Sequence, residues 1–99
     1  MDTKRWTPHR EISHRLEDLT AEEREFLLDY VTNNFIATKT INHKHTAYGL
    51  KQRFTREHFY VTQEQFAEAM RRVGYSVEST DGGDAYFGIS EKSPYFELR

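Results

Sequence analysis

HTAYGLKQRFTREHFYVTQEQFAEAMRRVGY, residues 45–75, predicts two short amphipathic helices joined by a connector too tight for a simple antiparallel hairpin. Thr46 is the expected N-cap of the first helix, and Thr62 with Gln65 forms a capping box for the second. Gly74 is the expected C-terminal cap. The apolar positions of the two inner faces are Ala47, Leu50 and Phe54, then Phe66, Met70 and Val73. This pattern is typical of a helix-turn-helix, a motif of many DNA-binding proteins.

The residues that follow this stretch predict β-structure. YSVES alternates polar and apolar residues, TDGGD supplies turn glycines and AYFGIS is rich in β-formers, so residues 75–90 are expected to form a β-hairpin. The segment FYV, residues 59–61, is also β-prone and could pair with the hairpin. Helices followed by a hairpin are the order of a winged helix. We therefore expect an α+β fold, a small winged helix-turn-helix-like domain of three to four helices plus a C-terminal hairpin.

Two more helices are predicted before this stretch. Thr20 and Glu23 form a capping box for a helix with a long apolar stripe. Thr7 is placed to cap a shorter helix that starts at Pro8 and ends near Leu19, because a proline at the first helical position costs no hydrogen bond. The chain thus opens with a short helix and a longer one.

These elements divide the chain into three parts. We expect a helical extension over residues 1–19, the winged-helix-like domain over residues 20–92 and an aromatic tail over residues 93–99. Gly49 weakens its helix, which suggests the close approach of a neighbouring segment. One core is predicted to contain Phe26, Leu27, Val31, Leu50, Phe54, Phe66, Met70, Val73, Val77, Phe87 and Ile89.

Composition narrows the function classes. Ninety-nine residues without an internal repeat favour one small domain, whose core depends on aromatic side chains, at 14% of the chain. The absence of cysteine excludes disulfides, thiolate zinc sites and a cysteine nucleophile. No apolar run is long enough for a transmembrane helix or a signal peptide, so we expect a cytoplasmic protein without a membrane partner.

Metal binding and catalysis find little support in the sequence. His43 and His45 stand two residues apart in HKH, a predicted loop, and neither a cysteine nor a carboxylate stands beside them at a ligand spacing. The chain lacks a phosphate-cradling glycine loop, a nucleophile elbow and an HExxH motif, and DGGD is explained as a turn. We expect no metal, no cofactor and no enzymatic activity.

Charge is unevenly distributed along the chain, although the net charge is only −2. Residues 39–75 hold seven basic and three acidic side chains, whereas acidic side chains are in excess on either side of this segment. Such a basic middle can mark a nucleic-acid-binding face. The leading prediction is a regulator that binds double-stranded DNA and could form a homodimer. Its candidate contact residues are Lys44, Lys51, Arg53, Arg56, Gln65, Arg71 and Arg72.

Several short pieces of the chain resemble a known family. INHKHTAYGLKQRF, YVTQEQFAEAM, RVGY and YFGISEKS, between about residues 31 and 92, are similar to small phage and prophage proteins of low-GC Gram-positive bacteria. The resemblance implies an origin in a mobile element and a winged-helix-like fold, and it brings no catalytic motif. The chain departs from the family in its acidic hairpin turn and its end, SPYFELR. Tyr95, Phe96 and Leu98 of this end could pack on their own core or on a second subunit.

Acidic side chains support an alternative function. Glu64 and Glu68 lie on the side of the second helix where a DNA-binding helix would read bases, and they repel phosphate unless arginines neutralise them. Phages use small acidic proteins to block host defence nucleases, including CRISPR effectors. The alternative is therefore an acidic, protein-binding inhibitor of a basic host nuclease. Its candidate contact residues are Tyr48, Glu64, Glu68, Asp81 and Asp84.

Overall fold

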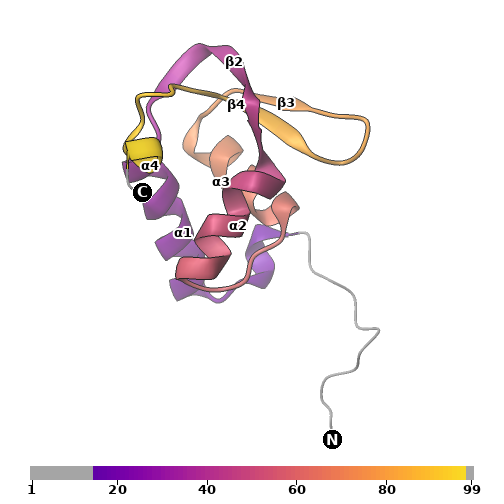
Figure 1. Cartoon of the computed structure of the whole chain (residues 1–99). Helices are drawn as coiled ribbons and strands as arrows, with labels where there is room; N and C mark the ends of the chain where they lie inside the picture. Colours follow the sequence, from indigo (N-terminus) through magenta and orange to yellow (C-terminus); the bar gives the residue numbers. More distant parts are fainter. Residues whose placement is uncertain (1–14, 98–99) are drawn as a thin grey trace, which may run out of the picture.

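The computed structural model describes residues 15–97 and confirms an α+β fold with four α-helices and a three-stranded antiparallel sheet (Figure 1). The elements in chain order are η1 Leu16–Asp18, α1 Ala21–Asn34, β2 Ala37–Thr46, α2 Ala47–Glu57, α3 Gln63–Val73, β3 Val77–Ser79, β4 Ala85–Ile89 and α4 Pro94–Glu97. The predicted hairpin is present, with Val77 of β3 opposite Phe87 of β4. The helix predicted to begin at Pro8 falls largely outside the described residues, and its last part is the 3-10 turn η1.

Local capping chemistry sets the helix boundaries, as predicted. Thr20 with Glu23 and Thr62 with Gln65 form complete capping boxes, in which each threonine oxygen accepts from the backbone N–H three residues on and the longer side chain accepts in return. Gly74 ends α3 at a φ of 115°, a left-handed conformation that residues with a Cβ rarely adopt. These boundaries therefore follow from short-range contacts alone.

The third strand of the sheet is β2, and the prediction that FYV supplies it is wrong. The strand order is β2-β4-β3, with Ala37 opposite Ile89 and Thr46 opposite Tyr86. Residues 59–61 form no strand, and the backbone N–H of Val61 donates to a threonine hydroxyl at 3.3 Å, because this segment turns the chain from α2 into α3. HKH was predicted to be a loop, and it lies inside β2 instead.

Close packing of β2 on β4 occurs at a glycine that the sequence did not single out. A Cβ at Gly88 would lie 2.5 Å from the carbonyl oxygen of Thr38, so the two strands could not keep this separation around any larger residue. The prediction for Gly49 is wrong, since a Cβ there would meet only Thr46 Oγ1, at an ordinary 3.6 Å. Gly49 is compatible with its helix but is not required by a neighbour.

The core lies between the sheet and the helices, which Figure 1 shows below the strands. Eight of the predicted core residues are buried and Val77 is half-buried against them; the buried ones are Leu27, Val31, Leu50, Phe54, Phe66, Met70, Phe87 and Ile89. Phe26 and Val73 were also predicted to be core, but they are 37% and 36% exposed. Phe26 faces a surface groove and Val73 is the last residue of α3, so neither is enclosed on all sides.

The C-terminal tail packs on the chain's own core. The Tyr95 ring stacks on Phe35 with centroids 4.8 Å apart, and its hydroxyl donates to the carbonyl oxygen of Leu50 at 3.2 Å. Phe96 packs beside it, while Leu98 lies outside the described residues. Across residues 15–97, no helix combines the length and the apolar character needed to cross a membrane.

Candidate nucleic-acid interface

Lys51 is a predicted phosphate contact, but its side chain is buried and contacts other residues of the chain. Its side chain is almost fully buried, and its ammonium nitrogen lies 5.4 Å from the ring centroid of Tyr48 and 4.7 Å from that of Tyr60. Both tyrosines are about half exposed, as was predicted for Tyr48. Lys51 therefore fixes two surface rings by cation–π contacts and does not itself reach solvent.

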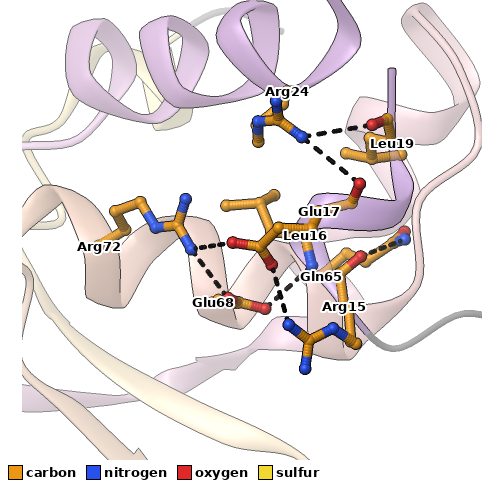
Figure 2. Close-up of polar contacts among 8 residues, drawn as sticks. All are labelled: Arg15, Leu16, Glu17, Leu19, Arg24, Gln65, Glu68 and Arg72. Carbon is orange, nitrogen blue, oxygen red and sulfur yellow. Dashed lines mark hydrogen bonds and ion pairs between the residues drawn. The ribbon is translucent and has the colours of Figure 1, made fainter. Parts of the chain in front are cut away.

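The segment around η1 covers part of the α3 face that was predicted to read bases (Figure 2). Gln65 is buried, and its Nε2 donates to the carbonyl oxygen of Arg15 at 3.0 Å. Glu68 Oε1 accepts from the backbone N–H of Leu16 at 2.9 Å. Two side chains assigned to this reading face thus hold the N-terminal segment in place instead.

Arg72 completes this attachment. Its Nη2 donates to Glu17 at 2.7 Å and to Glu68 at 3.1 Å, as Figure 2 shows. The hydrogen bond from Arg72 lowers the pKa of the Glu17 carboxyl below its usual value, and Glu17 in turn raises the pKa of Arg72. Of the predicted contacts on α3, only Arg71 has an exposed side chain without a hydrogen bond or ion pair among residues 15–97.

The acidic candidates also separate into two groups. Glu64, Glu68 and Asp84 line one groove of about 420 Å³ between α3 and the hairpin, with Arg71 among its walls. Asp84 Oδ1 accepts from the backbone N–H groups of Tyr48 and Ala85, so this carboxylate ties the hairpin to the start of α2. Asp81 is exposed at the turn and does not line the groove.

Three of the basic candidates converge on a different groove. Lys44, Arg53 and Arg56 line a depression of about 430 Å³ between the end of β2, α2 and α4. Arg53 forms its floor: its guanidinium lies 4.4 Å from the ring centroid of Tyr95, donates to the Tyr95 carbonyl oxygen and pairs with Glu57 at 3.2 Å. The side chains of Lys44 and Arg56 are exposed and have no hydrogen bond or ion pair within residues 15–97. We call this depression the basic groove.

Each histidine of β2 has a carboxylate partner that sequence spacing did not reveal. His43 Nε2 lies 3.2 Å from Glu78, and His45 Nε2 lies 2.8 Å from Glu91 at the edge of the basic groove. A hydrogen bond from Asn42 and the neighbouring His45 lower the pKa of Glu91. The pairs arise because β3 and the segment after β4 bring these carboxylates to the sheet. Within residues 15–97, no three side chains of metal-ligating type come close enough together to hold an ion.

The outer face of α2 continues the basic groove. Tyr48, Gln52 and Arg56 recur every fourth residue, are all exposed, and lie on one side of the helix. Gln52 Nε2 donates to the Tyr48 hydroxyl at 3.3 Å. Sequence reasoning assigned base contacts to α3 and did not use this stripe, although its four-residue spacing of polar residues is visible in the sequence.

Comparisons of the chain with protein-family models, with curated proteins and with solved structures find no match. Function is therefore inferred from the exposure, contacts and charge of the chain's own residues.

Proposed function

We propose that this protein is a non-catalytic DNA-binding regulator of winged-helix type that contacts phosphates through the basic groove and the outer face of α2. The observation that carries the proposal is the convergence of Lys44, Arg53 and Arg56 on one groove. Lys44 and Arg56 are the exposed members, and exposed ammonium and guanidinium groups supply most of the affinity for a nucleic-acid backbone by releasing counterions. Arg53 is largely buried and already paired with Glu57, so it shapes the groove and is not expected to contact phosphate.

The charge of the other surfaces favours α2 over α3 as the DNA-contacting helix. The outer face of α2 presents Tyr48, Gln52 and Arg56, which combine hydrogen-bonding groups with a positive charge. The face of α3 carries carboxylates, and the segment around η1 covers part of it. A phosphate backbone laid along α2 meets fewer like charges than one laid along α3.

The order of the elements supports the winged-helix part of the proposal. A helix, a strand, two helices and a hairpin follow one another, and the first strand pairs with the last. This is the order expected of a helix-turn-helix completed by a small sheet. In most helix-turn-helix proteins the second helix of the pair contacts DNA. In this proposal the first helix of the pair, α2, makes that contact.

Salt-dependent DNA binding tests the proposal. In a fluorescence anisotropy titration with duplex DNA, Lys44→Ala/Arg56→Ala should weaken binding and flatten the plot of log affinity against log salt by about 0.9 for each lost phosphate contact. The matched control is Lys39→Ala/Lys92→Ala, which removes the same charge at exposed positions outside the basic groove. An equal loss in both variants, or no binding of wild type at low salt, would overturn the proposal.

A second candidate function is the acidic inhibitor of a host nuclease. The observation that favours it is the groove that gathers Glu64, Glu68 and Asp84 beside the hairpin. The variant that tests this candidate is Glu64→Gln/Asp81→Asn, which changes two of the candidate contact residues and leaves the backbone hydrogen bonds to Glu68 and Asp84 in place. If this candidate is right, wild type should inhibit DNA cleavage by a purified CRISPR effector nuclease. Glu64→Gln/Asp81→Asn should inhibit cleavage less than wild type does. Lys44→Ala/Arg56→Ala should inhibit cleavage to the same extent as wild type.

A further inference from the structure

A third, larger groove opens between α1 and α2, with a cavity volume of about 740 Å³. Phe26, Tyr30 and His58 form its aromatic floor, and Glu22, Glu25 and Asp29 stand along its α1 wall. Arg53 contributes to this groove and to the basic groove, so the two lie on either side of that residue. Neither proposed function uses the α1–α2 groove.

The aromatic floor is held rigidly by the core beneath it. The Phe26 ring centroid lies 4.8 Å from that of His58 and 6.0 Å from that of Phe54, and Tyr30 packs edge-on against Phe54 at 4.8 Å. Phe26 nevertheless remains 37% exposed, within the groove. An exposed ring that packs edge-on against a buried ring, here Phe54, is a preorganised surface for stacking with a planar group.

The carboxylates on the α1 wall are available for a ligand. The side-chain carboxylates of Glu22, Glu25 and Asp29 have no hydrogen bond or ion pair with any other residue among 15–97. Glu22 lies in the first helical turn, where a negative charge stabilises the helix. Glu25 and Asp29, four residues apart, repel one another along α1 and weaken it. The fold therefore gives no stabilising reason for this pair of charges.

We propose that the α1–α2 groove binds an arginine-bearing segment of a partner protein. A guanidinium can stack on the Phe26 ring and donate two parallel hydrogen bonds to a carboxylate of α1, and this groove offers both groups together. A lysine ammonium lacks the planar shape for both contacts, so the groove should prefer arginine. The acidic wall also repels nucleic acid, so the two grooves are expected to favour different ligands although Arg53 lines both.

Peptide binding to the full chain tests the inference. The probe is a fluorescein-labelled twelve-residue peptide of alternating arginine and glycine, compared with the matching lysine peptide by anisotropy. Wild type should bind the arginine peptide more tightly, and Glu25→Gln/Asp29→Asn should weaken that binding about tenfold. Phe26→Leu keeps an apolar side chain but removes the ring, and it should abolish the preference for arginine over lysine. Circular dichroism confirms that each variant is folded.

The control separates this site from general attraction to an acidic protein. Asp81→Asn/Glu97→Gln makes the same change in net charge at exposed positions outside the groove, and it should alter binding less than about twofold. Three results would each overturn the proposal. One is a control variant that weakens peptide binding as much as Glu25→Gln/Asp29→Asn does, and another is a wild type that shows no preference for the arginine peptide. The third is self-association of wild type that Glu25→Gln/Asp29→Asn abolishes. Glu25→Gln/Asp29→Asn should bind DNA at least as tightly as wild type does. The DNA-binding proposal and the arginine-binding proposal can therefore fail independently, and the two assays show which one has failed.

Discussion

Gly88 is the residue at which the sheet tolerates least change. Replacing it by alanine would drive a Cβ to 2.5 Å from the backbone oxygen of Thr38, so β2 must move away from β4. We expect Gly88→Ala to lower the free energy of unfolding by about 1–3 kcal/mol, as overpacking of a closely packed site does. Urea denaturation measures this change. The control is Gly82→Ala, where a Cβ meets nothing within 4 Å, and it should stay within about 0.5 kcal/mol of wild type.

Tyr30 makes stability sensitive to alkaline pH. Burial raises the pKa of its hydroxyl from 10.0 to about 12, so folding favours the neutral form. The stabilising contribution is complete below pH 10 and is lost as the pH rises through about 12. Tyr30→Phe cannot ionise, so its melting temperature should fall less than that of wild type across this window. A residual fall is expected, because burial also raises the pKa values of Tyr75 and Tyr95. Identical profiles for the two proteins would contradict the prediction.

At the level of elements, η1 belongs to the folded core. Leu16 is fully buried, and η1 packs against both α1 and α3. We expect Leu16→Ala to cost about 2–5 kcal/mol of unfolding free energy, through lost burial and a residual cavity. Ile36→Ala removes a side chain that is 49% exposed and should cost far less. Chemical denaturation of both variants provides the comparison, and similar midpoints would show that η1 is only loosely attached.

Sequence reasoning succeeded where an element is specified by residues close together in the chain. The capping boxes at Thr20 and Thr62 join positions three residues apart, and the glycine turn of the hairpin is equally local. It failed where partners are distant. β2 contains no fully buried residue and lacks a regular apolar alternation. It is stabilised by β4, whose paired residues lie 40 to 52 positions later in the chain.

The candidate site was harder to predict than the fold for the same reason. From the sequence of α3 alone, Gln65 and Arg72 are expected to point to solvent. Both instead donate hydrogen bonds to distant partners, Arg15 and Glu17, which lie 50 and 55 positions away in the chain. Periodicity along α3 cannot reveal a segment that packs over it from elsewhere. In contrast, the exposure of Tyr48 and Arg56 follows directly from their place on α2, opposite Leu50 and Phe54.

For the whole molecule, the tail is expected to be part of a single cooperative unit. Deleting residues 93–99 removes the Tyr95 ring from Phe35 and exposes the surface beneath it. We expect a loss of at least about 3–5 kcal/mol, the range for removing one buried aromatic side chain. Tyr95→Phe is the matched control, because it keeps the ring and loses only the bond to Leu50, for about 0.5–1.5 kcal/mol. Thermal unfolding followed by circular dichroism should show one transition in each protein, and an unchanged melting temperature after deletion would contradict this view.

The position of β4 in the sheet has a consequence for biosynthesis. β4 is the middle strand of the sheet, but it is the last strand to be made, since synthesis proceeds from the N-terminus. A nascent chain that ends before residue 85 has β2 and β3 with no strand between them, so their backbone groups are open to pairing with other chains. The sheet can close only after residues 85–89 have been made and have left the ribosome. Folding of the sheet is therefore expected to wait for β4, and a nascent chain that ends before β4 is the species most in need of a chaperone.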